Sequence, residues 1–248
     1  MAKPGLLILG GTTLGAGLAR LTGPRQRVIY SLAGRTKARA IADVITRSGG
    51  FGGAEALAAY LAGNDITAVV DATHAHAAEI SRNCEIACRT AKVPLLRLEE
   101  PPWQPEQGDH WIAVETIAQA RDVAVAKASR IFVTTGRQDM LPFASEIRCW
   151  WLARVIAPGS DLPPLVNGDY IHGRGPFEIA DETALLRKHE IGAVISKNAG
   201  GAATYAKIAA ARELALPVIM ISRPLPGSAP NVSTTDAAIN WLALTLGA

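Results

Sequence analysis

The chain has 248 residues, of which 49% are hydrophobic and 19% charged, and its formal net charge at pH 7 is only +3. This length allows one large domain or two modest ones with a buried core. No apolar run reaches the roughly 18 residues of a membrane span, and no basic cluster with interleaved aromatics indicates nucleic acid. Three cysteines make no disulfide framework. We therefore expect a globular, cytoplasmic protein without nucleic-acid, membrane or metal partners.

The first predicted strand, residues 6–9, runs directly into a glycine-rich turn and a helical segment, in LLILGGTTLGAGLAR. Free backbone N–H groups and the helix dipole make such a strand-to-helix turn a phosphate site. The dinucleotide fingerprint G-x-G-x-x-G is matched only in part, because Gly15 takes its last position and Thr12 replaces its middle glycine. A tight turn without a ligand is the alternative. The cofactor-binding residues predicted here are Gly10, Gly11, Thr12 and Thr13.

The second predicted strand, RVIY, leads into SLAGRT. In dinucleotide-binding folds this position, about 20 residues after the glycine turn, meets the adenosine ribose; an acidic residue favours NAD and an arginine accommodates a 2′-phosphate. No Asp or Glu occurs in residues 31–42, so Arg35 favours NADPH. A capping turn with a solvated arginine is the alternative. The cofactor-binding residues predicted here are Ser31, Gly34, Arg35 and Thr36.

Two further junctions in the first half carry glycine or polar residues. GGFGG precedes an alanine-rich helix, and either close packing or a ligand contact at Gly52 explains it. The strand AVVDA ends near Thr73 and His74, at the edge of the sheet where open α/β folds bind ligands. We assign Thr73 to the cofactor and His74 as a catalytic candidate; a hydrogen bond at the helix start is the alternative for His74.

Short apolar strands alternate with helical stretches along the whole chain, which is typical of parallel α/β structure. The proline-rich, charged segment EEPPWQPEQGDH separates two such halves. The sequence therefore predicts an α/β protein of two domains, each a mainly parallel sheet flanked by helices, with the active site in the cleft between them. Residues 1–104 form the Rossmann-like dinucleotide-binding domain and residues 105–248 the second domain, which contributes to substrate binding.

In the second half, IFVTTGRQ and AVISKNAGG end strands in hydroxyl, basic and amide groups, and RGPF adds an arginine at a helix start. Such groups bind carboxylates or phosphates, although each one alone could be a solvated surface residue. The hydrolase motifs G-x-S-x-G and H-E-x-x-H and the Y-x-x-x-K pair are missing. The substrate-binding residues predicted here are Thr135, Arg137, Gln138, Arg174, Lys197, Asn198, Gly200 and Gly201.

Along nearly its whole length the chain resembles the precorrin-6A reductases of cobalamin biosynthesis. The resemblance lies in an ordered series of blocks: ILGGTT, SLAGRT, GGFGG, DATH, PLLRLEEPPW, TTGRQ, RGPF, KNAGG with ATYAKI, and PVIMISRP. The chain departs from the family at Leu14, where an acidic residue often follows the threonines, and in DATHAH, where the family has DATHPF.

The resemblance implies an NADPH-dependent oxidoreductase that reduces one carbon–carbon double bond of precorrin-6A, giving precorrin-6B. The substrate is then a tetrapyrrole with many carboxylates, handed over to neighbouring enzymes of the pathway, and His74 and Lys197 are the candidate proton donors. Three alternatives stay open: a cobalt-precorrin-6A reductase of the anaerobic route, a different NADPH-dependent reductase, and a non-catalytic NADPH-sensing module.

Overall fold

The computed structural model describes residues 5–34, 40–156 and 162–247. Contacts divide the chain into two compact units: the first runs up to Pro101 and resumes at Leu225, and the second is Pro102–Pro224. Within the described ranges, no helix is long and apolar enough to cross a membrane.

The first unit is built on a six-stranded sheet in the order β12-β5-β4-β1-β2-β3, in which every pair of neighbours is parallel. From the central β1 the chain builds one half through β2 and β3, then crosses to β4; this is the order of dinucleotide-binding folds. The strands are β1 (Gly5–Leu9), β2 (Arg27–Leu32), β3 (Ile45–Ser48), β4 (Ile66–Asp71), β5 (Leu95–Leu98) and β12 (Asn231–Val232). The helices are α1 (Thr13–Thr22), α2 (Ala54–Gly63), α3 (Ala78–Ala91) and α8 (Thr235–Leu246).

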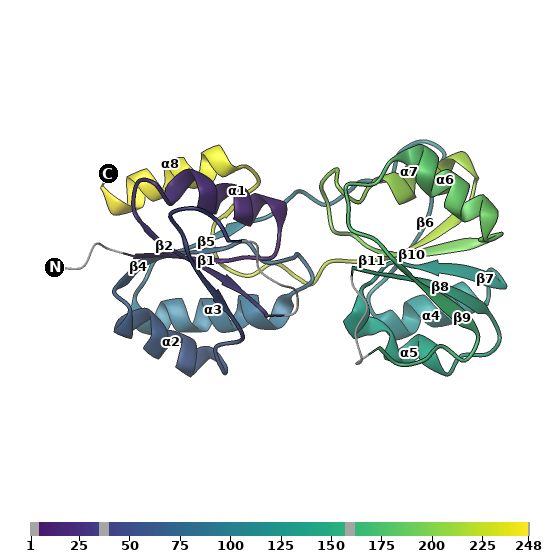
Figure 1. Cartoon of the computed structure of the whole chain (residues 1–248), viewed down its shortest axis with the longest axis horizontal. Helices are drawn as coiled ribbons and strands as arrows, with labels where there is room; N and C mark the ends of the chain where they lie inside the picture. The colour runs from purple at the N-terminus through teal and green to yellow at the C-terminus, as the bar shows by residue number, and fades with distance from the viewer. Residues whose placement is uncertain (1–4, 35–39, 157–161, 248) are drawn as a thin grey trace. The chain divides into compact units, whose positions relative to one another are not determined.

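Helices cover both faces of this sheet, α1 and α8 on one face and α2 and α3 on the other (Figure 1). Successive side chains of a strand point to opposite faces. Leu6 and Ile8 accordingly belong to the cluster that includes α1 and α8, while Leu7 and Leu9 pack with α2 and α3. A strand buried on both faces must be apolar throughout, which explains the continuous run LLIL.

The second unit contains another six-stranded parallel sheet, in the order β6-β11-β10-β7-β8-β9. Its core includes the fully buried Phe132 and Trp151. The strands are β6 (His110–Val114), β7 (Arg130–Val133), β8 (Trp150–Val155), β9 (Gly168–His172), β10 (Ala193–Lys197) and β11 (Pro217–Ile221). The helices are α4 (Ile117–Val125), α5 (Leu141–Ala144), α6 (Ile179–Lys188), α7 (Ala206–Glu213) and the 3-10 helix Arg137–Asp139. The prediction of two α/β units with parallel sheets is thereby confirmed.

One edge strand of each sheet is distant in sequence from the strand that it pairs with. Strand β6, which precedes β7, pairs with β11 in the second sheet, and β12, which follows β11, pairs with β5 in the first. The predicted domain limits, 1–104 and 105–248, therefore differ from the units at the C-terminal end: residues from Leu225 onward belong to the first unit. The physical reason is that α8 buries Ala238 and Leu242 in the apolar cluster of the first sheet.

We predict that the C-terminal helix stabilises the first unit through its buried face. Leu242 is 5% exposed and Leu244 is 87% exposed on the same helix. Leu242→Ala should lower the free energy of unfolding by about 2 to 5 kcal/mol, the usual cost of a buried leucine truncation. Leu244→Ala should change it by less than about 0.5 kcal/mol. Urea unfolding followed by circular dichroism measures both, and equal effects would contradict the packing of α8.

Candidate active site

The turn between β1 and α1 is tied to both neighbouring strands. The Gly10 N–H donates to the Ser31 carbonyl at 2.8 Å, and the Gly11 N–H donates to the Tyr30 hydroxyl at 3.2 Å. Thr12 is the N-cap of α1: its hydroxyl accepts from the Gly15 N–H at 3.1 Å and donates to the Ala72 carbonyl, beyond the end of β4, at 2.8 Å. The turn is therefore fixed between the ends of β2 and β4, at the point where the strand order reverses.

The glycines of this turn and of the start of α1 have two different steric roles. A Cβ on Gly10 would lie 2.2 Å from the Tyr30 ring, and one on Gly15 would lie 2.9 Å from Ala72. Gly11 has φ +129° and is exposed, and a Cβ there would meet nothing within 4 Å. Gly10 and Gly15 thus permit close packing of the turn and helix. Gly11 leaves space for a ligand beside the turn, although its own N–H is bonded to Tyr30, and the exposed Thr13 begins the helix next to it.

A buried ion pair organises the end of β4. Asp71 is 2% exposed, and its carboxylate lies 2.8 Å from Arg97 Nη1 of β5. The Asp71 carboxylate also accepts from the backbone N–H and the hydroxyl of Thr73, at 3.0 and 2.7 Å. Arg97 donates to the Thr73 hydroxyl and carbonyl and pairs with Glu99 as well. Thr73, predicted as a cofactor residue, is thereby held by both Asp71 and Arg97, and its hydroxyl is engaged within the protein.

Sequence reasoning missed Arg97, although an arginine inside the apolar strand PLLRL signals a buried partner. His74 follows this ion-pair network directly and is exposed. Its Nδ1 accepts from the His76 backbone N–H at 3.2 Å, and the two imidazole rings lie 5.7 Å apart. The candidate acid of the first unit is therefore presented to solvent at the carboxyl edge of the sheet, on a loop that Asp71 and Arg97 fix.

At the end of β2, Ser31 is bonded to Arg47 of the neighbouring β3, a basic residue that the sequence analysis did not single out. Ser31 is 5% exposed, and its hydroxyl accepts from Arg47 Nη1 of β3 at 2.8 Å. Gly34, with φ +83°, is exposed after β2, and Gly52, with φ +86°, is exposed before α2. The remaining predicted residues of this segment, Arg35 and Thr36, lie outside the described residues.

In the second unit, the corresponding reversal of strand order lies between β7 and β10. Thr135 follows β7, is 7% exposed, and its hydroxyl has no hydrogen-bond partner in the described parts of the chain. A buried hydroxyl without a partner is costly, and a ligand group would satisfy it. Gly136, with φ +95°, comes next, followed by Arg137 and the exposed Gln138 on the 3-10 helix.

The end of β10 shows which predicted donors are already engaged. Lys197 Nζ lies 2.6 Å from the carboxylate of Asp139, which fixes the ammonium group beside the 3-10 helix. The Asn198 side chain accepts from the Trp103 N–H at 2.8 Å and donates to the Trp103 carbonyl at 3.0 Å. The Asn198 side chain therefore holds the polypeptide in place through its oxygen and one of its two Nδ2 hydrogens, and its direct contact with substrate stays a prediction.

The segment after β10 lies against the RGPF segment. Gly200 and Gly201 have φ of +74° and +71°, and the Trp103 indole N–H donates to the Gly201 carbonyl at 2.8 Å. The Phe177 N–H donates to the Ala203 carbonyl, so the RGPF segment is bonded to the segment that contains both glycines. Arg174 of that segment is exposed.

A buried lysine lies beneath this segment. Lys207, in the first turn of α7, is 6% exposed; its ammonium donates to the Thr204 carbonyl at 2.6 Å and lies 5.0 Å from the centre of the Trp103 ring. Burial lowers the pKa of Lys207 to about 7; Glu182 opposes this shift and Arg154 adds to it. Its position among alanines in ATYAKIAAA was the available sequence signal, because a helix face of that composition is buried.

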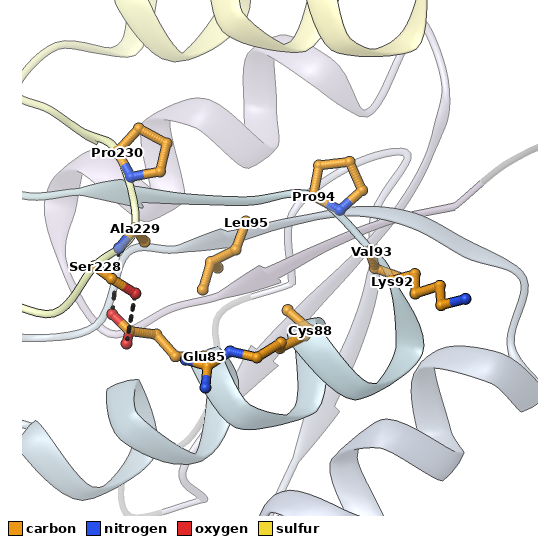
Figure 2. Close-up of a pocket in the computed structure, with 10 residues that line it drawn as sticks. Glu85, Cys88, Lys92, Val93, Pro94, Leu95, Ser228, Ala229 and Pro230 are labelled. Carbon is orange, nitrogen blue, oxygen red and sulfur yellow. Dashed lines mark hydrogen bonds between the residues drawn. The ribbon is translucent and has the colours of Figure 1, made fainter.

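A hollow of about 470 Å³ occurs on the first unit, away from these residues (Figure 2). Leu95 at the start of β5 and Pro230 just before β12 line it, so it lies at the amino edge of the sheet. Glu85 of α3 accepts there from Ser228 and Ala229. None of the predicted site residues lines this hollow, and among the described residues no group of three His, Cys, Asp or Glu could hold a metal ion.

Comparisons with known proteins agree with one another. The sequence model of the family described as Precorrin-6x reductase CbiJ/CobK matches residues 5–243. A Precorrin-6A reductase of Sinorhizobium sp is 41% identical, covering 98% of this chain and 95% of that protein. A Cobalt-precorrin-6A reductase of Salmonella typhimurium is 29% identical over 91% of this chain and 90% of that protein. A solved structure described as CobK precorrin-6A reductase has a TM-score of 0.88 at 37% identity, covering 98% of this chain and 97% of that one.

We predict that Lys207 makes the stability of the protein rise with pH. Between pH about 7 and the ordinary lysine value of 10.5, the unfolded chain binds a proton that the folded chain has released, so the free energy of unfolding increases with pH. Lys207→Met removes this dependence. The free energy of unfolding of the variant, relative to that of the unsubstituted protein, should therefore increase as the pH falls toward 7. Urea midpoints at several pH values measure the difference. The exposed Lys188→Met is the control, and a Lys207→Met effect independent of pH would contradict the assignment.

Proposed function

The chain belongs to the precorrin-6x reductase CbiJ/CobK family, and from this we propose that it reduces a macrocycle carbon–carbon double bond of precorrin-6A to give precorrin-6B, with NADPH as the hydride donor. The observation that carries the proposal is the family match over residues 5–243, joined to a glycine turn at the reversal of strand order in the first sheet. The reaction belongs to cobalamin biosynthesis.

The first unit fits a dinucleotide. Gly10 and Gly15 allow the turn and helix to pack closely, and the open space beside Gly11 gives a phosphate access to the N-terminus of α1. We assign the pyrophosphate to Gly10, Gly11, Thr12 and Thr13. The adenosine ribose belongs at the end of β2, near Ser31 and Gly34. Arg35 and Thr36 remain proposed cofactor residues of the same segment, and Gly52 and Thr73 belong to neighbouring junctions of the same edge.

NADPH supplies a hydride when bound, and the task left to the protein is to orient two flat reactants and exclude competing reactions. We propose that the second unit binds the carboxylates of the tetrapyrrole. Thr135, with its unpartnered buried hydroxyl, and the fixed ammonium group of Lys197 support this assignment. Arg137, Gln138 and Arg174 add side-chain donors, and we assign the backbone N–H groups of Gly200 and Gly201 to the same task. Asn198 supports the loop through Trp103.

A proton must reach the carbon next to the one that receives the hydride. His74 and Lys197 are the two candidates. We favour His74, because it is exposed at the carboxyl edge of the cofactor unit on a loop fixed by Asp71 and Arg97. The ammonium group of Lys197 is held by Asp139, an arrangement that suits a stationary charge for a substrate carboxylate.

The relatives favour the cobalt-free substrate. Precorrin-6A reductases of Sinorhizobium sp and Rhodococcus erythropolis are each 41% identical to the chain, whereas the Cobalt-precorrin-6A reductase of Salmonella typhimurium is 29% identical. The cobalt-bearing ring is therefore the second candidate substrate.

We predict that the purified protein oxidises NADPH only when precorrin-6A is present. An anaerobic assay should show the loss of cofactor absorbance together with conversion of the macrocycle spectrum, faster with NADPH than with NADH. Parallel reactions with cobalt-precorrin-6A in place of precorrin-6A test the second candidate substrate. Tight NADPH binding without turnover of either ring would overturn the reductase assignment and favour a sensing module.

We also predict that His74→Gln lowers turnover by at least about tenfold while the affinity for NADPH stays unchanged. General acid catalysis typically contributes a factor of about 100 to 10,000, and water replaces part of it. Single-turnover kinetics and a separate binding titration measure the two effects. His76→Gln is the matched control on the same loop and should retain most activity. A full rate in His74→Gln would direct attention to Lys197 as the proton donor.

A further inference from the structure

We propose that Arg47 determines the specificity for NADPH over NADH. It would bind the 2′-phosphate of NADPH through the guanidinium N–H groups that are not bonded to other described residues. The inference rests on the cofactor assigned in the proposed function. It adds a residue of β3 to a site whose other proposed members lie at the ends of β1, β2 and β4 and on the loops after β1 to β4.

The position of Arg47 follows from strand pairing. Strand β3 is parallel to β2, with Arg47 opposite Ser31, so both side chains lie near the carboxyl edge of the sheet. Arg47 Nη1 donates to the Ser31 hydroxyl at 2.8 Å and to the Gly49 carbonyl at 3.0 Å, and Nη2 donates to the Gly50 carbonyl at 3.1 Å. The guanidinium carbon lies 3.9 Å from the centre of the Phe51 ring. These contacts fix the group before a ligand arrives.

The guanidinium group of Arg47 has more N–H donors than its contacts with the described residues use. Arginine has five N–H donors in a planar fork. The three hydrogen bonds named above use both donors of Nη1 and one of Nη2. In the described parts of the chain the Nε donor and one Nη2 donor have no acceptor, and charge-assisted hydrogen bonds from such groups bind phosphate.

The charge of Arg47 is not balanced by a carboxylate in the described parts of the chain, since its partners there are a hydroxyl, two carbonyls and aromatic rings. Three arginines differ from it, because each pairs with a carboxylate: Arg97 with Asp71, Arg154 with Glu182 and Arg212 with Asp109. A half-buried cation held by neutral groups favours an anion from outside, because desolvation without a counter-charge is costly.

The location matches the ribose end of a dinucleotide site. Ser31 lies at the end of β2, where the adenosine ribose binds in such folds. The loop that continues from β2 runs against the loop that Arg47 holds, because a Cβ on Gly34 would lie 3.1 Å from the Gly49 nitrogen. The Arg47 fork is therefore adjacent to the segment that meets the ribose 2′ position.

The experiment compares the binding of NADP⁺ and NAD⁺ by calorimetry, without substrate. Arg47→Met should weaken NADP⁺ binding at least about tenfold, as expected for lost charge-assisted hydrogen bonds, and change NAD⁺ binding by less than about twofold. Arg130→Met is the matched control, because Arg130 also stacks on an aromatic ring, Trp150 at 4.0 Å, and donates to a carbonyl. The control should leave both affinities unchanged.

Equal weakening of both dinucleotides in Arg47→Met would show a structural role and overturn the inference. Unchanged NADP⁺ affinity would also overturn it and leave Arg35 as the proposed phosphate ligand. Failure of the unsubstituted protein to bind either dinucleotide would instead contradict the proposed function itself, so the two failures are distinguishable.

A second measurement uses the unsubstituted protein and therefore does not depend on the folding of a variant. Phenylglyoxal modifies accessible arginines, and mass spectrometry of the unsubstituted protein locates the modified residues. Adenosine 2′,5′-bisphosphate should protect Arg47 at concentrations at which adenosine 5′-monophosphate does not. Equal protection by the two nucleotides, or none, would overturn the inference.

Discussion

The constraint on which the structure depends is that each of its sheets is parallel, with central strands buried on both faces. Such strands must be apolar along their length, so polar and charged side chains collect where the strands end. At the carboxyl edge of the first sheet these are Thr12, Asp71 and His74, and at that of the second they are Thr135 and Lys197. The reversal of strand order beside β1 and beside β7 then opens space between neighbouring loops, and this is where ligands of such folds bind.

The loops at the carboxyl edge of the first sheet are held by hydrogen bonds and by one buried ion pair. The Thr12 hydroxyl joins the glycine turn to the end of β4, and the Asp71–Arg97 pair fixes the loop that carries His74. Asp71 is a buried charge with its partner and several hydrogen bonds in place, so loss of Arg97 alone would leave an uncompensated carboxylate. Such a loop is rigid before any ligand binds, which lowers the entropic cost of binding.

The buried and half-buried cations of the protein fall into two groups, and each unit contains members of both. Arg97, Arg154 and Arg212 are balanced by carboxylates and build the protein. Arg47 and Lys207 instead have only neutral hydrogen-bond partners in the described parts of the chain. For Lys207, which is almost completely buried, the result is a pKa lowered to about 7. For Arg47, which is half-buried at a sheet edge, the result is a fixed cation available to an anion.

The sequence by itself determined the class of fold, the apolar strands such as LLIL and PVIMI, the glycine turn after β1 and the family. These features are local, because strand burial, turn chemistry and ordered motifs are written in neighbouring residues. It did not reveal the edge strands: β3 reads ITRS, with little apolar pattern, and β12 is only two residues long. It also placed residues 225–248 with the wrong unit.

Tertiary structure decided everything that joins residues distant in the chain. Asp71 meets Arg97 across adjacent strands, and Arg47 reaches Ser31 from 16 positions away because β3 pairs with β2. The Asn198 amide, whose residue type alone suits ligand binding, is engaged by Trp103, 95 positions away. The physical reason is the same in each case: composition shows which groups can donate or accept, but only the packed fold determines which of them already have partners.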